Sequence, residues 1–405
     1  MRSINHLFCI CWVFGLLGGF ASILSDPHDT SGGQSGIYIL VWVIMYSIFI
    51  ASAVLIFPKQ ALRYHKYEFI LIAIGVLAIV STAWSQLPME TFKYAASLML
   101  TLLFSLFFYR CYTPQQAIDL ITLVIGIMAI VGIMLYFAGV SFAYYIDPIS
   151  RFNILGLTPL KGLFSHKIYA GIYCALGFYL SFYSTYKKTY KVLISSSCLL
   201  HVMLSGSSTG LVVLIFTGLI YLYFNLQRRM KLSRGIGTAI KTSVTILGII
   251  AFTFFNEIVI YFGRDPSLTG RTALWEWALY FIQQKPTLGW GYSGIFSDSA
   301  DAPSRIINDY TAYQAPHFHN AYLQIMAELG LLGGILVFTV MLLTLTKIAK
   351  TSSAKFTVRY QECYLLIIWH AMLCGFVVNN LFRFNDISTF LISITFLYTF
   401  KYSKR

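Results

Sequence analysis

The sequence predicts an all-α polytopic membrane protein that forms a single integral membrane domain over residues 1–405. Hydrophobic residues make up 58% of the chain and charged residues only 11%, which is too apolar for a water-soluble fold. Apolar stretches of about 20 residues recur along the whole chain, and each can cross a bilayer as a helix. Basic residues gather in alternate connections between these stretches, as the positive-inside rule requires.

The apolar stretches predict about twelve transmembrane helices. Helices are expected because a lone lipid-exposed strand would leave its backbone hydrogen bonds unsatisfied. The first stretch resembles the core of a signal peptide, but many spans follow it, which favours a retained helix. Only Gly206-Ser207 separates the seventh stretch from the eighth. The predicted spans are 5–24, 36–57, 68–84, 91–109, 117–138, 166–185, 190–206, 208–227, 242–262, 319–347, 361–382 and 386–402.

The net charge of +14 reflects topology and not a nucleic-acid partner. With the N-terminus placed inside, 20 of the 29 basic residues fall on the inner side. Of the 15 acidic residues, only Glu68, Asp119 and Glu362 fall there. The excess positive charge therefore belongs to the cytoplasmic connections. We predict a multi-pass protein with cytoplasmic N- and C-termini and no nucleic-acid partner.

The largest outer connection, 263–318, is inserted between spans 9 and 10 and is predicted to contain short amphipathic helices. One begins at Arg271 and stops before Pro286. Its apolar face predicts a helix along the bilayer surface whose positive end presents Arg271 to an anion, with phosphate favoured. Alternatively, Arg271 is a surface charge at the membrane edge that pairs with an acidic residue of an outer connection. The apolar positions are Leu274, Trp275, Ala278, Phe281 and Ile282.

His317 and His319 lie at the entrance of the tenth span. Two histidines in a His-x-His pair can bind a metal, but no third ligand is evident nearby, so no metal site is predicted. Either histidine can instead cap the following helix, or act as a general base, because imidazole titrates near neutral pH. Asn320, Gln324 and Glu328 follow at a spacing of four, and such polar stripes in membrane helices usually face a cavity. The stripe favours His319 as the base and leaves the role of His317 open.

The outer connection 139–167 provides a second candidate surface. Cations in short translocated loops are disfavoured, so those retained there call for a reason such as an anionic ligand. Its basic residues are Arg151, Lys161 and Lys167. His166 and Lys167 begin a span, as His319 does, so two histidines are expected to flank one cleft.

Five short motifs, taken in order, resemble the O-antigen ligase and polymerase superfamily. The resemblance covers most of residues 80–335, and the sequence of residues 263–271 is most similar to that of the exopolysaccharide-production polymerases. The motifs are Trp84-Ser85 with Pro88, Lys161-Gly162 with His166-Lys167, Thr269-Gly270-Arg271 to Trp275, Gly289-Trp290-Gly291, and His319-Asn320 with Tyr322-Leu323 through Glu328-Leu329-Gly330.

The resemblance implies a glycosyltransferase of the C-type membrane fold in the bacterial inner membrane, with its active site facing the periplasm. Such enzymes transfer a glycan from undecaprenyl diphosphate to an acceptor hydroxyl. The acceptor is the lipid A–core sugar in ligases and a lipid-linked repeat unit in polymerases. By position, His319 is the base and Arg271 binds the diphosphate. An inverting displacement needs both groups. No cofactor is implied, and the lack of an Asp-x-Asp pair agrees with a metal-independent reaction.

The chain departs from the family pattern at Ser208. Family members commonly carry an arginine or lysine in the Ser-x-Ser-x-Thr segment that opens the eighth span. A second diphosphate contact must therefore come from elsewhere, and the candidates are Lys167, Lys161 and Arg151. The predicted supporting residues are His317, His166, Asn320 and Glu328, with Arg151.

Two other classes of function remain alternatives. A flippase or polysaccharide transporter for the same lipid-linked glycans would need ionisable groups near the middle of the membrane, whereas these spans are nearly free of them. A receptor or scaffold would use the outer loop to bind a partner. The predicted partners are the lipid-linked donor, the acceptor and membrane lipids, and the sequence specifies no oligomeric state.

Overall fold

The computed structural model describes residues 2–24, 36–56, 66–146, 152–230, 271–297, 299–311, 315–348 and 357–402. Within these ranges the chain is all-helical apart from one isolated bridge between Tyr144 and Leu160, which confirms the predicted fold class at this level. The α-helices are α1 (Arg2–Leu16), α2 (Gly19–Leu24), α3 (Gly36–Ile56), α4 (Glu68–Val80), α5 (Pro88–Cys111), α6 (Pro114–Phe137), α7 (Lys167–Tyr183), α8 (Lys188–Leu204), α9 (Ser208–Met230), α12 (Arg271–Gln284), α13 (Arg305–Thr311), α14 (Ala321–Ile348), α15 (Val358–Gly375) and α16 (Ile387–Tyr402).

Each predicted span within the described residues overlaps a helix, and the protein is a polytopic membrane protein. Helices α5, α6, α9 and α14 are each long and apolar enough to cross a membrane, and shorter apolar helices include α1, α3, α4 and α16. Helices α8 and α9 are separate, as the Gly206-Ser207 interruption predicted. The predicted span 242–262 lies outside the described residues.

Two predicted spans have different bounds in the structure. The first is divided at Gly18, whose φ of 85° suits glycine, so α1 ends and the short α2 begins. The eleventh ends at Gly375, earlier than predicted, and the N–H groups of Phe376 and Val377 close its last turn on the carbonyls of Leu373 and Cys374. Residues 376–386 therefore form a non-helical segment between α15 and α16, which we call the 376–386 segment.

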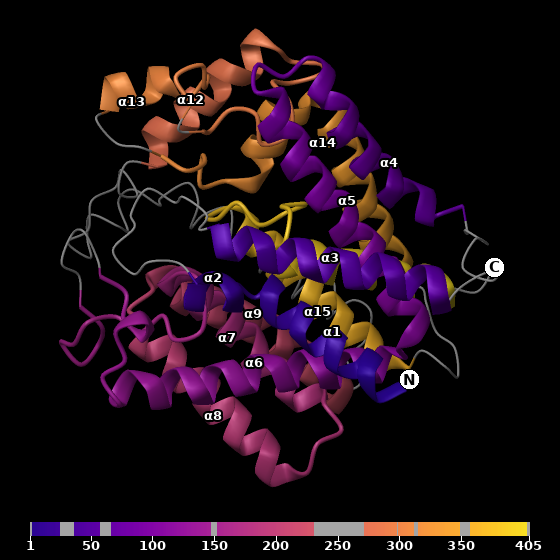
Figure 1. Ribbon diagram of the computed structural model, residues 1–405. Helices are drawn as coiled ribbons and strands as arrows, with labels where there is room; N and C mark the ends of the chain where they lie inside the picture. Colours follow the sequence, from indigo (N-terminus) through magenta and orange to yellow (C-terminus); the bar gives the residue numbers. More distant parts are fainter. Residues whose placement is uncertain are drawn as a thin grey trace.

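The helices pack into two groups joined by α15. Helices α6, α7, α8 and α9 pack together, and α4, α5, α14 and α16 form the second group, while α15 contacts members of both. Figure 1 shows α12 and α13 at the upper left, while both chain ends lie on the right. Helices α7 and α9 approach closely, since a Cβ on Gly210 would lie 2.7 Å from the Cα of Gly171.

Helix α14 is kinked at Gly330, and this kink positions the candidate site. Gly330 has a φ of 61° and a ψ of −161°, a conformation essentially confined to glycine. The carbonyls of Ala327 and Glu328, just before the kink, accept hydrogen bonds of 3.0 Å and 2.9 Å from the backbone N–H groups of Trp290 and Gly291. The outer part of α14 is therefore joined to the loop that follows α12.

Candidate functional site

Helix α12 begins at Arg271 and ends at Gln284, before Pro286, as the sequence predicted. Its buried side chains include Leu274 and Phe281, which belong to one cluster with the fully buried Phe318. The predicted placement of this apolar face on the bilayer surface is therefore wrong for these residues. They pack against the loop instead, because Phe318 and its neighbours provide an apolar surface inside the protein. This packing fixes Arg271 relative to the histidines on either side of Phe318.

The histidine pair has a defined geometry. The backbone N–H of His319 donates to Nδ1 of His317 over 3.0 Å, and the ring centroids are 4.1 Å apart. The cap of α14 is Asn320, whose Oδ1 accepts from the N–H groups of Tyr322 and Leu323. Neither histidine is needed for capping. His319 has a φ of 53°, an unusual conformation for a non-glycine residue.

Burial and nearby positive charge keep both imidazoles neutral at neutral pH. Burial, and then the charge of Arg271, lower the pKa of His319 to about 4. Burial lowers the pKa of His317 well below its ordinary value, and electrostatic interactions with His319, Arg383, Arg271 and His166 lower it further. Residues from three other parts of the chain therefore act electrostatically on His317. Nδ1 of His319 is buried and has no hydrogen-bond partner among the described residues.

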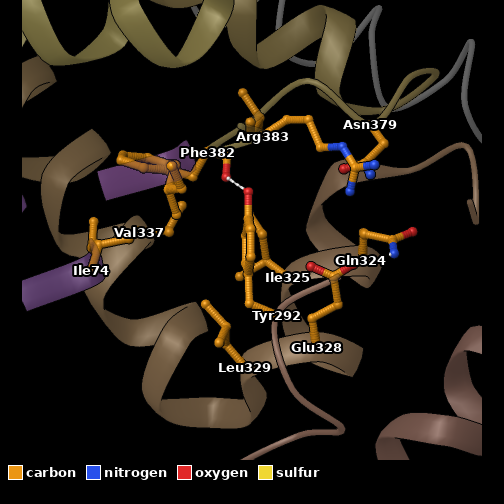
Figure 2. Close-up of a pocket in the computed structure, with 12 residues that line it drawn as sticks. Ile74, Tyr292, Gln324, Ile325, Glu328, Leu329, Val337, Asn379, Phe382 and Arg383 are labelled. Carbon is orange, nitrogen blue, oxygen red and sulfur yellow. Dashed lines mark hydrogen bonds between the residues drawn. The ribbon is translucent and has the colours of Figure 1, made fainter. Parts of the chain in front are cut away.

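The predicted polar stripe is present on the outer part of α14. Oε1 of Gln324 accepts from the N–H of Phe318 over 2.9 Å, and its Nε2 donates to Oε1 of Glu328 over 2.6 Å. Both side chains are buried, and both line a pocket together with Tyr292 and Arg383. Gln324 and Glu328 therefore face a pocket, which Figure 2 shows, whereas Asn320, the first residue of the predicted stripe, caps α14 instead.

The second candidate surface, the connection 139–167, leads into the start of α7. His166 is the N-cap of α7, with Nδ1 accepting from the N–H of Ile168 over 3.1 Å and Nε2 lying 2.8 Å from the hydroxyl of Tyr145. The ammonium of Lys167 lies 5.0 Å from the centroid of the same tyrosine ring. His166 thus serves a structural role as a cap.

The remaining predicted cations lie in different surroundings. Lys161 is buried, its backbone N–H donates to the carbonyl of Ala143, and burial lowers the pKa of its ammonium. Ser208, where the family cation was expected, is an exposed residue at the start of α9. Arg151 lies outside the described residues.

Two of the sequence motifs contact each other beside the site. The indole Nε1 of Trp84 donates to the carbonyl of Leu288 over 3.2 Å. A Cβ on Gly291 would lie 2.7 Å from the Cβ of Ser85, so only glycine fits this approach. The Trp84-Ser85 motif therefore supports the loop that joins α12 to α14.

The sequence did not single out Arg383 as a site residue. Its Nη1 donates to Oγ of Ser293 over 3.0 Å, and its side chain lines the pocket with Asn379, Gln324 and Glu328. Because the eleventh span was predicted to continue to residue 382, Arg383 was counted only as an outer cation near the membrane. The signal that could have revealed it is the density of polar residues in 379–386, directly after an apolar run.

The central part of the chain is similar to a known protein family. Residues 192–338 match the family model described as O-antigen ligase. The resemblance to the O-antigen ligase family is confirmed. The O-antigen ligase region includes Arg271, both histidines and the polar stripe, while His166, Lys167 and Arg383 lie outside it.

A broader similarity extends over most of the chain. The exopolysaccharide production protein ExoQ of Rhizobium meliloti (strain 1021) is 24% identical over 347 residues. The match covers 81% of this chain and 75% of ExoQ. Both similarities are to proteins of surface-polysaccharide production, and they agree with the polytopic fold.

Proposed function

We propose that this protein is a membrane glycosyltransferase of surface-polysaccharide biosynthesis. It transfers a glycan from undecaprenyl diphosphate to an acceptor sugar hydroxyl on the periplasmic face of the inner membrane. The match to the O-antigen ligase family supports this reaction class, and the charge asymmetry of the sequence supports the orientation. The reaction needs no nucleotide sugar, because the lipid diphosphate is the leaving group.

One observation carries the proposal: burial and the charge of Arg271 lower the pKa of His319 to about 4, so its mostly buried imidazole is neutral at neutral pH. A neutral imidazole accepts a proton, and its unpartnered Nδ1 shows that no described protein donor occupies that nitrogen. Arg271 opens α12, so the helix N-terminus and the guanidinium add to the same positive potential. A base and a cation that acts electrostatically on it are groups that glycan transfer from a diphosphate requires.

The displacement follows from these groups. A ring nitrogen of His319 takes the proton of the acceptor hydroxyl, and the acceptor oxygen bonds to the anomeric carbon of the donor sugar. The bond from that carbon to the diphosphate oxygen breaks, and its electron pair leaves with the diphosphate, whose charge Arg271 offsets. Lys167, Lys161 and Arg151 are further cations proposed for the diphosphate, and His317, His166, Asn320 and Glu328 are proposed to hold the site in shape.

Binding of the donor also strengthens the base. The charge of Arg271 is one of the two causes that lower the pKa of His319. When the anionic diphosphate neutralises Arg271, that cause is removed and the pKa of His319 rises towards its ordinary value. A bound donor therefore prepares His319 for proton transfer, while an empty site keeps it neutral.

The acceptor in this proposal is the next lipid-linked repeat unit. This choice of polymerase over ligase rests on the similarity to ExoQ, whose name associates it with exopolysaccharide production. A ligase acting on the lipid A–core sugar has the same chemistry and differs in the acceptor admitted. The surface-glycan pattern of a deletion strain separates the two, since only loss of ligase activity leaves lipid-linked polymer uncapped.

The proposal is tested with purified protein in liposomes. Lipid-linked repeat units that accumulate in a deletion strain serve as substrates, and glycan lengthening is followed on gels. We expect His319→Ala and Arg271→Ala to abolish lengthening, whereas His6→Ala retains it. His6 is a suitable control because its side chain contacts Tyr112 in another part of the protein. Movement of glycans between leaflets without a new glycosidic bond would instead identify a transporter.

A further inference from the structure

We propose that Arg383 is a second cation for the diphosphate of the donor, and that the side-chain amide of Asn379 donates to the same group. This inference rests on the proposed glycan transfer from a lipid diphosphate. It supplies a contact that the sequence left open at Ser208. It also gives the 376–386 segment a role in binding the leaving group.

The backbone on both sides of Arg383 is held firmly in place. The hydroxyl of Tyr292 donates to the carbonyl of Phe382 and accepts from the N–H of Phe384, each over 2.9 Å. Oγ1 of Thr389 donates to the carbonyl of Arg383 over 2.7 Å. Phe382 has a φ of 49°, a conformation that costs a non-glycine residue about 1–3 kcal/mol and persists only where neighbouring contacts enforce it. Arg383 is therefore presented by a rigid turn.

The side chain of Arg383 reaches the pocket that Gln324 and Glu328 also line. Figure 2 shows the guanidinium extending over the pocket from the 376–386 segment, facing the space into which Gln324 and Glu328 project from α14. Its hydrogen bond to Ser293 uses one of five N–H donors, and within the described residues it forms no ion pair.

Asn379 adds a second donor to the same pocket. Its side chain is buried, and Nδ2 has no hydrogen-bond partner among the described residues. A buried amide donor without an acceptor is unfavourable, so such a group commonly awaits water or a ligand. The pocket has room for about one water-sized group, so the guanidinium and the amide on its wall fit a single phosphoryl oxygen of a diphosphate.

The position of Arg383 relative to the histidines agrees with this role. The charges of Arg383 and Arg271 both lower the pKa of His317, so the two guanidinium groups lie near one imidazole although they come from different elements. A leaving diphosphate carries at least two negative charges spread over two phosphoryl groups. Two cations at separate positions can offset that charge better than one.

The competing interpretation is that Arg383 only compensates the buried carboxylate of Glu328. Both groups line the pocket, and Arg383 acts electrostatically on Glu328. Within the described residues, however, no N–O distance between them falls within 4.0 Å, and the Glu328 carboxylate already accepts from Gln324. If compensation is the whole role of Arg383, replacing Glu328 by glutamine must restore the function of an Arg383 variant.

The test measures binding of two probes to full-length protein in nanodiscs: undecaprenyl diphosphate and undecaprenyl monophosphate. We expect Arg383→Gln to weaken binding of the diphosphate about tenfold or more, because several charge-assisted hydrogen bonds are lost. Arg383→Lys keeps the charge but loses the paired N–H donors of the guanidinium, so its affinity for the diphosphate should lie between those of wild type and Arg383→Gln. Binding of the monophosphate should change much less. Lys93→Gln is the matched control, since Lys93 is an outer cation already paired with Glu90.

Each outcome has a clear meaning. Equal preference for the diphosphate in wild type and Arg383→Gln overturns the inference but leaves the proposed function intact. A wild type that does not bind the diphosphate at all overturns the proposed function itself. Recovery of diphosphate binding in the double variant Glu328→Gln with Arg383→Gln assigns Arg383 to charge compensation only. Asn379→Leu, which removes the amide but keeps the bulk, should weaken diphosphate binding in a folded protein.

Discussion

The backbone N–H of His319 donates to Nδ1 of His317, and the two imidazole rings stand 4.1 Å apart between centroids. Because Nδ1 of His317 accepts this bond, the proton of the neutral ring lies on Nε2. His317 therefore fixes the backbone of His319 in its unusual conformation, with a φ of 53°. The two histidines have different tasks: one is the proposed base, and the other positions it.

Replacing His317 by alanine should lower the rate of glycan transfer about 10- to 100-fold, because His319 loses the acceptor that holds its backbone. The apparent affinity for the donor should change little, since the cations remain. Steady-state kinetics in liposomes separate these effects. Asn at this position offers an acceptor oxygen and should recover part of the rate. An equal loss in affinity and rate would assign His317 to donor binding instead.

The rate of glycan transfer should fall as the pH decreases through the region of the His319 pKa, near 4 in the absence of donor. Below that pKa the imidazole is protonated and cannot accept the acceptor proton, while above it the ring is neutral and active. Arg271→Gln removes one cause of the lowered pKa, so any residual activity of this variant should decline at a higher pH than in wild type. Rates at donor concentrations well below KM report the free enzyme, in which no diphosphate neutralises Arg271, and such rates measured between about pH 3 and pH 8 check both statements. If the fall in rate at low pH occurs at the same pH in Arg271→Gln as in wild type, Arg271 does not lower the pKa of His319.

Gly330→Ala should prevent the kink of α14 from forming. A Cβ at this position would lie 2.3 Å from the carbonyl oxygen of Thr287, and backbone cannot move away as a flexible side chain can. We expect loss of folded protein or of transfer activity. Gly334→Ala is the matched control, because its Cβ would meet only the flexible side chain of Met326. Yield and thermal unfolding in detergent distinguish the two variants, which should behave alike if the kink is unimportant.

Arg110→Ala should destabilise the protein by about 3 kcal/mol without affecting the site. Glu68 is fully buried, and its Oε2 lies 2.7 Å from Nη2 of Arg110, so removing the arginine leaves a buried charge unpaired. The double variant with Glu68→Gln should regain most of the lost stability. Thermal unfolding measures the difference, and transfer per folded molecule should stay at the wild-type level. A double variant no more stable than Arg110→Ala would show that the pair is unimportant.

The sequence predicted the features that depend on local patterns. Apolar length located the helices, and helical spacing with Pro286 located α12 from Arg271. The spacing of four from Asn320 to Glu328 predicted a polar stripe, of which Gln324 and Glu328 face a pocket. These features follow from residues close together in the chain, so one sequence is enough to find them.

The features that escaped prediction depend on contacts between distant segments. The apolar run through Val378 looks like a continuing helix, and only the hydrogen bonds of Tyr292 with Phe382 and Phe384 show how the chain turns there. The buried face of α12 matched a bilayer-surface helix equally well, until Phe318 supplied its partner. No local pattern specifies either pairing.

The kink at Gly330 has a consequence for the way the reaction is assembled. Hydrogen bonds from Trp290 and Gly291 attach the outer turns of α14 to the loop after α12, so the proposed base and Arg271 belong to one structural unit. Arg383 belongs to another, the turn that leads into α16. The two units meet at Tyr292 and Ser293, which hydrogen-bond across the boundary. The proposed base and the first cation for the leaving group thus come from one unit and the second proposed cation from the other, so small changes at Tyr292 and Ser293 alter the alignment of the two cations without changing either of them.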